Sequence, residues 1–196
     1  ACLGFMNAMH LAGTMIDSGQ IDYAIVVDGE GTREIYDNTI NHLLEHGEGL
    51  ADIIANFASL TLGSGSAAMV LGRHSENPGG HRLVRGFFHA ATHHHELCVG
   101  SLQGMITDTR GLLDAGTELA KLAWDDAGAG DTWGGRDCYI FHQVSEVHTN
   151  AMLAVLGIDP ERVPKTFPYY GNIGPAAVPI TLATVADELS PGDSVL

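Results

Sequence analysis

The chain is short of basic side chains. Its 196 residues include 9 Lys and Arg against 24 Asp and Glu, which gives a formal net charge of −15 at pH 7. Binding to nucleic acid depends on neutralising phosphates with Lys and Arg, so this balance argues against a nucleic-acid partner.

Long apolar runs and paired cysteines are also lacking. No run reaches the roughly 18 apolar residues that cross a bilayer, and no basic-then-apolar signal segment opens the chain. Three cysteines, an odd number at wide intervals, do not form a disulfide framework. A reducing cytoplasm is therefore the expected location, and a nucleophilic thiol would need one.

What the chain does contain fits a compact α/β protein. Hydrophobic residues make up 45% of it, and 25 residues are glycine. Apolar spacing predicts helices over residues 3–18, 109–127, 147–156 and 175–189. Short apolar runs predict strands over residues 23–28, 67–71, 82–89 and 138–142. Residues 33–58 are expected to form a helical insertion with loops. The segment S-E-N-P-G-G at 75–80 is the best internal boundary.

Cys2 is the first candidate for chemistry. It lies just ahead of an apolar helical pattern, and a helix N-terminus can lower a thiol pKa towards a reactive thiolate. The alternative is a small buried cysteine packed among alanines, which is the usual fate of an unpaired cysteine. Cys98 and Cys138 have no comparable neighbours, so we assign both to packing.

Two further residues favour a reactive Cys2 over a cysteine that only packs. His142 ends the apolar run C-Y-I-F-H, at the sheet edge where α/β proteins place catalytic groups. Asn172 lies between glycines in Y-Y-G-N-I-G-P, where it offers an uncharged N–H donor suited to an oxyanion hole. Taken alone, each has a plainer explanation: a histidine satisfied by backbone groups, and an ordinary turn. His148 is expected on a helix surface.

Other polar groups are weaker candidates. Three consecutive histidines, His93–His95, precede Glu96, but consecutive side chains cannot all reach one ion, so we expect no metal. The G-S-G-S at 63–66 lacks the lysine of a phosphate loop and is interpreted as the turn into a strand. Asp28, Glu30 and Asp108 could form a carboxylate site, although solvated faces are the favoured interpretation.

The settings and separations of Cys2, His142 and Asn172 resemble those of the thiolase superfamily, in its ketoacyl synthase III branch. Within that branch the chain is most similar to OleA-type enzymes, which join two fatty acyl-CoA molecules head to head. The segments that carry this resemblance are A-C-L-G-F, G-Q-I-D-Y-A-I-V-V-D-G-E, L-T-L-G-S-G-S-A-A-M-V-L, M-I-T-D-T-R, H-Q-V-S and G-N-I-G-P-A-A-V-P-I. The last two, at their mutual spacing, are highly specific.

The resemblance implies a thiolase-like fold, with two similar βαβ halves layered as α-β-α-β-α. Residues 1–74 would end the N-terminal half, starting at the nucleophile helix, and residues 82–196 would be a truncated C-terminal half. The chain is thus expected to be a fragment that lacks most of the first half and the C-terminal strands. The resemblance also implies that the protein is a homodimer.

By the same resemblance, Cys2 is the nucleophile, and His142 with Asn172 binds the thioester carbonyl of the second substrate. The expected activity is an acyltransferase reaction, a thioester Claisen condensation of fatty acyl-CoA through an acyl-cysteine, without a cofactor. Because coenzyme A is anionic, cationic contacts to it would have to be local or come from sequence beyond this chain. OleA-type enzymes use a glutamate base that precedes the cysteine and comes from the partner subunit.

Two alternatives stay open. One is a decarboxylating ketoacyl synthase III that extends with malonyl-carrier protein and shares the same three residues. H-Q-V-S in place of the H-Q-A-N usual in those initiation enzymes favours the OleA type. The other is a non-catalytic thiolase-fold subunit that packs against an active partner, which the intact set of Cys2, His142 and Asn172 argues against.

Overall fold

The computed structural model describes residues 2–102, 104–128 and 133–196. The α-helices are α1 (Gly4–Asp17), α2 (Arg33–His46), α3 (Leu50–Asn56), α4 (Thr109–Asp126), α6 (Glu146–Leu156), α7 (Phe167–Tyr170) and α8 (Ala177–Val185). The strands are β1 (Tyr23–Glu30), β2 (Gly65–Gly72), β3 (Cys98–Ser101) and β4 (Gly104–Thr107). Short 3-10 turns are η1 (Phe57–Thr61), η2 (Thr92–Leu97), η3 (Pro160–Arg162), η4 (Gly174–Ala176) and η5 (Ala186–Glu188).

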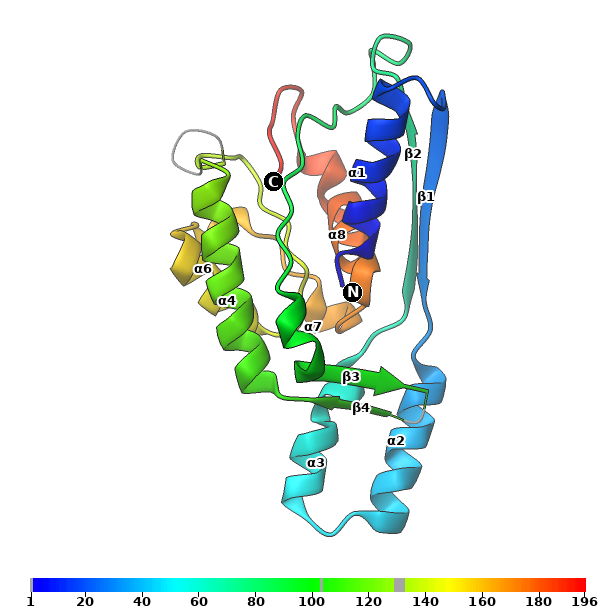
Figure 1. Cartoon of the computed structure of the whole chain (residues 1–196), viewed down its shortest axis with the longest axis vertical. Helices are drawn as coiled ribbons and strands as arrows, with labels where there is room; N and C mark the ends of the chain where they lie inside the picture. The colour runs from blue at the N-terminus through cyan, green and yellow to red at the C-terminus, as the bar shows by residue number, and fades with distance from the viewer. Residues whose placement is uncertain (1, 103, 129–132) are drawn as a thin grey trace.

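Strands β1 and β2 form an antiparallel pair along one side of the molecule (Figure 1). The register runs from Tyr23 opposite Gly72 to Glu30 opposite Gly65. Helix α1 packs on one face of this pair, and α8 contacts the same pair through β2 (Figure 1). Phe5, Met9 and Val26 are buried where α1 meets β1. Burial alternates along β1, as expected of a strand with one covered face.

A second core lies beside α6, where Tyr139, Leu153, Ile158 and Val163 are buried together. Helix α4 packs along α6, and α2 and α3 project at the other end of the molecule (Figure 1). Ser145 caps α6 by accepting a hydrogen bond from the His148 N–H, and Gly157 ends the helix at φ +66°. These signals confirm the predicted helix and its glycine stop.

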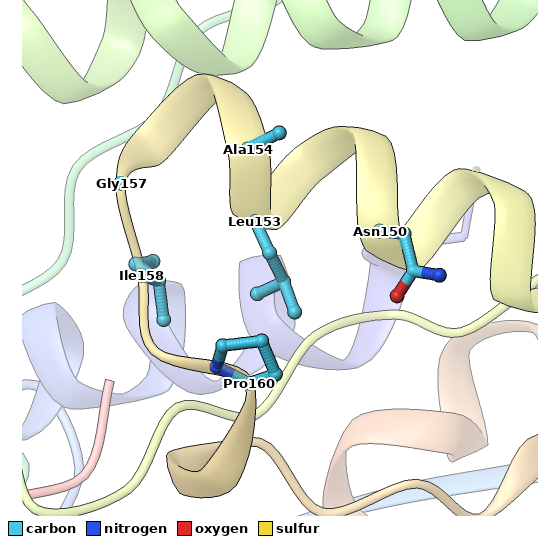
Figure 2. A pocket seen from close by; sticks show the side chains of 6 residues that line it. All are labelled: Asn150, Leu153, Ala154, Gly157, Ile158 and Pro160. Atoms are coloured by element: carbon cyan, nitrogen blue, oxygen red, sulfur yellow. The ribbon is translucent and has the colours of Figure 1, made fainter.

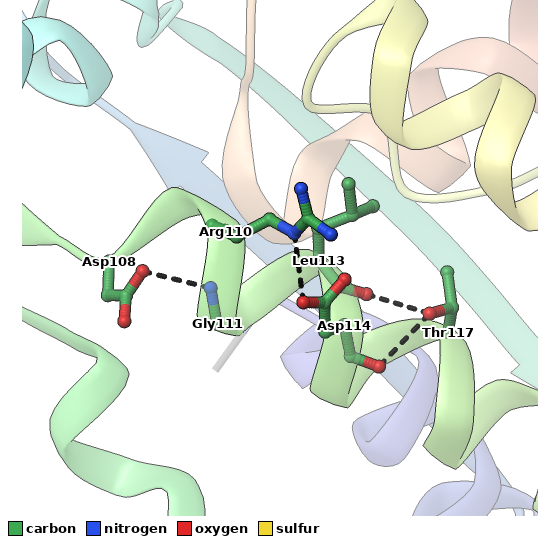
Figure 3. A network of polar contacts seen from close by, with 6 residues as sticks. All are labelled: Asp108, Arg110, Gly111, Leu113, Asp114 and Thr117. Atoms are coloured by element: carbon green, nitrogen blue, oxygen red, sulfur yellow. Dashed lines mark hydrogen bonds and ion pairs between the residues drawn. The ribbon is translucent and has the colours of Figure 1, made fainter.

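The motif M-I-T-D-T-R is a junction between a strand and a helix. Strand β4 ends at Thr107, and the Asp108 carboxylate then accepts a 2.9 Å hydrogen bond from the Gly111 N–H (Figure 3). In the first turn of α4, Arg110 Nε donates to Asp114 Oδ2 at 2.9 Å (Figure 3). This contact raises the pKa of the Arg110 guanidinium. Asp108 thus serves as a helix cap and not as part of a carboxylate site.

Three assignments made from the sequence need correction: the strands over 82–89 and 138–142, and the helix over 175–189. Residues 82–89 form no strand and instead pack against α1, where the Phe88 ring lies 4.9 Å from the His10 ring between centroids, tilted by 50°. Residues 138–142 are buried at Cys138 to Ile140, but they form only one isolated bridge, Cys138 to Val195. A strand needs a continuous ladder, and neither segment has one among the described residues.

The predicted helix over 175–189 is divided into η4, α8 and η5. Pro175 lies in η4 and has no N–H, and Pro179 follows in the first turn of α8. Both prolines are placed where a helix needs no N–H donor, which explains why the segment stays helical despite them. The helices over 3–18, 109–127 and 147–156 and the strands over 23–28 and 67–71 are confirmed.

Candidate active site

The segment that contains Asn172 is held by close backbone contacts to the entry of β2. The Asn172 N–H donates to the Thr61 carbonyl at 2.9 Å, and the Asn172 carbonyl accepts from the Gly63 N–H at 2.8 Å. A Cβ on Gly63 would lie 1.7 Å from the Tyr170 carbonyl oxygen, so only glycine fits there. The G-S-G-S segment is therefore the turn into β2, as predicted, and it also seats the Asn172 segment.

The side chain of Asn172 has a fixed orientation. Its Oδ1 accepts a 3.1 Å hydrogen bond from the Gly174 N–H, which identifies the oxygen and leaves Nδ2 as the other end of the amide. Among the described residues, Nδ2 has no hydrogen-bond partner. The amide N–H₂ group is thus available as an uncharged donor, which is the role expected for Asn172.

His142 lies at the end of the buried segment that follows Cys138. Both of its ring nitrogens are buried, and within the described ranges neither has a hydrogen-bond partner. Burial lowers the pKa of His142 to about 4; the backbone of Gly174 opposes the shift, although no hydrogen bond of normal geometry forms. The imidazole is therefore neutral at pH 7, so one nitrogen can accept a proton while the other donates.

Gln143 anchors the chain directly after His142. It is 1% exposed, its Nε2 donates to the Pro164 carbonyl at 2.8 Å, and its Oε1 accepts from the N–H groups of Thr166 and Phe167. Sequence analysis did not single out this residue. A glutamine directly after a strand-end histidine carries no signal of burial, because glutamine is mostly exposed in proteins.

His148 is partly buried, and its predicted place on a helix surface is wrong. Its Nδ1 lies 2.9 Å from the Ser145 Oγ, and its Nε2 is buried without a partner among the described residues. Burial lowers the pKa of His148. The His148 side chain lies in the first turn of α6 and folds back onto Ser145, the N-cap residue. Helical periodicity alone does not predict this contact, so it misplaced His148.

Cys2 precedes Leu3, the N-cap residue of α1, and is exposed in this chain. Desolvation by the surrounding protein atoms nevertheless raises the pKa of the Cys2 thiol, and Cys98 and Glu30 raise it further. The expectation that α1 would lower this pKa is therefore wrong. Cys98 is exposed, and its charge contributes to raising the pKa of Cys2, so its assignment to packing is also wrong. Cys138 is buried, as expected.

Residues 171–176 are here named the Gly174 turn, and they adjoin the segments of all three candidates. Gly174 has φ +53°, and its N–H donates to Asn172 Oδ1. Its backbone also lies beside the His142 ring, where it opposes the lowering of the His142 pKa. A Cβ on Gly4, two residues after Cys2, would lie 3.8 Å from Pro175 Cγ. The segment that follows Cys2 and the His142 ring therefore both lie next to the turn that contains Asn172.

Two carboxylates belong to the same region. Asp28 and Glu30 lie on the covered face of β1, so the predicted solvated faces are wrong for both. The Asp28 Oδ2 is buried with no hydrogen-bond partner in the described part of the chain. The signal that could have placed them is the alternation along 23–30, because every second residue of a half-buried strand faces the core.

A separate pocket lies at the C-terminal end of α6. It has a volume of about 360 Å³ and is lined by Asn150, Leu153, Ala154, Gly157, Ile158 and Pro160 (Figure 2). None of these side chains can act as a nucleophile, acid or base, so the pocket is not the catalytic centre. Residues His93–His95 are exposed on η2, and the described ranges contain no group of three or more ligands suited to a metal.

Two family models match the chain. The model for 3-oxoacyl-[acyl-carrier-protein (ACP)] synthase III matches residues 1–90, and the model for the C-terminal part of that enzyme matches residues 132–196. The chain belongs to the 3-oxoacyl-[acyl-carrier-protein] synthase III family. The sequence-based recognition of this branch is thereby confirmed.

Three curated proteins are similar to this chain over its whole length. An acyl-CoA:acyl-CoA alkyltransferase of Xanthomonas campestris is 40% identical over 199 residues, and one of Shewanella oneidensis is 34% identical. A beta-ketoacyl-[acyl-carrier-protein] synthase III of Rhodospirillum rubrum is 26% identical. Each match covers the whole of this chain but only 59% to 60% of the relative. The chain therefore spans about three-fifths of the length of these relatives.

Solved structures establish the fold. A cysteine-to-alanine variant of OleA from Xanthomonas campestris superposes with a TM-score of 0.93 at 38% identity, covering 99% of this chain and 58% of that one. A cysteine-to-serine variant of the same protein, with bound lauric acid and lauroyl-CoA, gives 0.92 at 39% identity, covering 99% and 59%. The chain therefore has the predicted thiolase-like α/β fold.

The depressed pKa of His142 predicts a dependence of stability on pH. An unfolded histidine takes up a proton near pH 6.5, whereas the folded residue resists it down to about pH 4. Lowering the pH through this window therefore favours the unfolded state, by up to about 3 kcal/mol. Urea unfolding at pH 7 and pH 4.5 measures the loss. His142→Asn should lose less stability than the unmodified protein over this interval; equal losses would contradict a buried neutral imidazole.

Proposed function

We propose that the protein is an acyltransferase that condenses two fatty acyl-CoA molecules through an acyl-cysteine at Cys2. The observation that supports the proposal is that the Gly174 turn, which contains Asn172, lies next to both His142 and the segment that follows Cys2. The 40% identity to an acyl-CoA:acyl-CoA alkyltransferase supports the choice of substrate.

In the first step, the Cys2 sulfur attacks the thioester carbon of one acyl-CoA. The thiol proton passes to a base, the bond to the coenzyme A sulfur breaks, and coenzyme A leaves as a thiol once it has taken up a proton. Because its pKa is raised, Cys2 begins as a neutral thiol and needs a proton acceptor. His142 can fill that role, since it is neutral and both ring nitrogens are unpartnered within the described ranges.

In the second step, a base takes a proton from the α-carbon of another acyl-CoA, and that carbon attacks the acyl group on Cys2. The resemblance to OleA-type enzymes implies that this base is a glutamate carboxylate of the partner subunit. A carbon–carbon bond forms, the carbon–sulfur bond to Cys2 breaks, and the thiolate recovers a proton. The product is a β-ketoacyl thioester. The Asn172 amide and a His142 N–H would stabilise the enolate oxygen, since both are uncharged donors held in place before reaction.

The proposal extends to the organisation of the protein. Residues 1–74 and 82–196 would belong to the N-terminal and C-terminal halves of the fold, and the active form would be a cytoplasmic homodimer that needs no cofactor. The cytoplasmic location rests on the cysteine content, and the other points rest on the resemblance to OleA-type enzymes. No helix among the described residues is long and apolar enough to span a membrane.

The test supplies lauroyl-CoA alone to the full-length protein and follows coenzyme A release and product mass. We expect a product that joins both acyl chains without release of carbon dioxide. The relatives named beta-ketoacyl-[acyl-carrier-protein] synthase III favour one competing reaction, in which malonyl-carrier protein is the second substrate. A product that forms only with malonyl-carrier protein, accompanied by carbon dioxide, would support that reaction. No turnover with either substrate would contradict both.

A further inference from the structure

Two different parts of the structure hold His142 and Asn172. The segment before His142 belongs to the second core, where Tyr139 is buried and its N–H donates to the Arg162 carbonyl at 2.9 Å. Asn172 is instead fastened by its backbone to the entry of β2. The relative position of the two side chains therefore depends on contacts that join these two parts.

Gln143 makes such contacts. It directly follows His142 in the chain and is 1% exposed. Its Nε2 donates to the Pro164 carbonyl at 2.8 Å, and its Oε1 accepts from the Thr166 N–H at 2.8 Å and from the Phe167 N–H at 3.1 Å. A glutamine amide has two N–H donors and an oxygen that accepts two bonds, so three of its four possible bonds reach this one segment.

The helix that Gln143 holds leads directly to Asn172. The first N–H groups of a helix have no partner inside it, and Thr166, the N-cap residue of α7, supplies no side-chain cap within the described part of the chain. The Gln143 oxygen takes that place. At the other end of α7, the Gly171 N–H donates to the Phe167 carbonyl at 2.9 Å, and Asn172 follows. One helical turn thus separates the residue bound by Gln143 from the proposed oxyanion donor.

We propose that Gln143 is a positioning residue for the condensation step, because its three hydrogen bonds fix the segment of His142 relative to the segment of Asn172. The inference deepens the proposed function and rests on it. In that function acylation uses His142, whereas condensation uses the His142 and Asn172 donors together. A change in their relative position should therefore slow condensation more than acylation.

The first test is Gln143→Met in the full-length protein, which keeps a long side chain and removes all three hydrogen bonds. Single-turnover reactions with lauroyl-CoA give the rate of Cys2 acylation and the rate of β-ketoacyl product formation in the same sample. We expect condensation to slow on the order of 10²-fold, which is the loss that a shift of about 1 Å in a reacting group can cause. Acylation should change far less.

Thr181→Val is the matched control for a purely structural effect. Thr181 is 0% exposed, and its Oγ1 lies 2.7 Å from the Thr166 Oγ1, so it also binds the segment before α7. Within the described residues it makes no hydrogen bond to His142 or Gln143. Valine keeps the shape and loses the hydroxyl. We expect a lower thermal unfolding midpoint but the same ratio of condensation to acylation as in the unmodified protein.

A double variant tests whether Gln143 acts through Asn172. Once the amide donor is gone, its position no longer matters, so Gln143→Met should cost little more in an Asn172→Ala background. Residues that act as one unit show such non-additive losses, whereas independent residues show additive ones. Full additivity of the two losses in condensation rate would overturn the inference.

Gln143→Glu gives a readout that a structural role alone would not move. A protonated glutamic acid can donate to the Pro164 carbonyl and accept from the two N–H groups, whereas the ionised form directs a negative charge at that carbonyl. Burial raises the pKa of a carboxyl group, so its ratio of condensation to acylation, relative to the unmodified protein at each pH, should recover from about pH 8 to about pH 6. Gln143→Met should show no recovery. This variant also carries the test if Gln143→Met does not fold by circular dichroism.

The outcomes separate this inference from the proposed function. If the unmodified protein condenses lauroyl-CoA but folded Gln143→Met and Gln143→Glu keep its ratio of condensation to acylation, only the inference is overturned. An equal loss of that ratio in Thr181→Val, or a loss in Gln143→Glu that is the same at both pH values, would overturn it too. An unmodified protein that neither acylates Cys2 nor forms product would instead contradict the proposed function.

Discussion

Replacing Cys2 with alanine is expected to abolish both acyl transfer and condensation. The methyl group of alanine cannot attack a thioester, and the other described cysteines are in different settings: Cys98 is exposed on β3, and Cys138 is buried. Stopped-flow detection of coenzyme A release should show a burst for the unmodified protein and none for Cys2→Ala. The β-ketoacyl product should be missing in the same reaction.

Cys98→Ala is the control for this loss. It removes a second exposed thiol near the same region, so it tests whether any accessible cysteine can carry the acyl group. We expect the burst to remain. If Cys2→Ala retains the burst while Cys98→Ala loses it, the nucleophile has been assigned to the wrong residue.

Asn172→Ala is expected to separate the two half-reactions. Its amide donor would act on the enolate of the second substrate, so acylation of Cys2 should continue while condensation slows. Removal of one oxyanion donor costs on the order of 10²–10³ in rate, about 3–4 kcal/mol. Single-turnover measurements compare the rate of acyl transfer with the rate of product formation in the same sample.

A structural effect must be distinguished from this catalytic one. Asn172 Oδ1 also accepts the Gly174 N–H, so alanine leaves that donor unpaired and can disturb the turn. Asn172→Asp keeps the acceptor and replaces the N–H₂ donor with a carboxylate oxygen, whose charge also repels the enolate. It should therefore slow condensation at least as much as Asn172→Ala while acylation of Cys2 continues. If both folded variants fail to acylate Cys2, Asn172 belongs to the first step and the division of labour proposed above is wrong.

The sequence identified the elements with strong local signals. Helix α1, helix α4 and helix α6 follow apolar periodicity over several turns, and Gly157 marks the end of α6 where a left-handed residue is required. The strands over 23–28 and 67–71 pair with each other, which supplies the ladder that a strand needs. Residues 82–89 have similar composition but pack against α1 by their side chains. Composition cannot distinguish these two cases.

The candidate site was predicted in part. Cys2, His142 and Asn172 were named from their settings and from the resemblance, and their joint role stays a prediction. The Gly174 turn contains Asn172 and lies next to His142 and to the segment that follows Cys2. The protonation states could not be read from the sequence, because desolvation depends on the folded surroundings. It raises the pKa of Cys2, although the residue precedes a helix.

Gln143 and Glu30 were missed as members of the site for a related reason. Both are polar residues whose importance comes from what surrounds them in three dimensions. Gln143 binds backbone groups more than 20 positions along the chain, and Glu30 rests on Gly174 across 144 positions. A single sequence shows neither contact. The alternation along residues 23–30 could have indicated which side Glu30 occupies, but the predicted strand ended at residue 28 and a solvated face was favoured for Glu30.

The central claim is that Cys2 carries the acyl group, and peptide mass spectrometry tests it most directly. The full-length protein is incubated briefly with lauroyl-CoA, quenched in acid to preserve thioesters, digested and compared with an untreated sample. The account predicts one lauroyl mass increment, on the peptide that contains Cys2, and its removal by hydroxylamine. An increment on the peptides of Cys98 or Cys138, or no increment while product still forms, would contradict it.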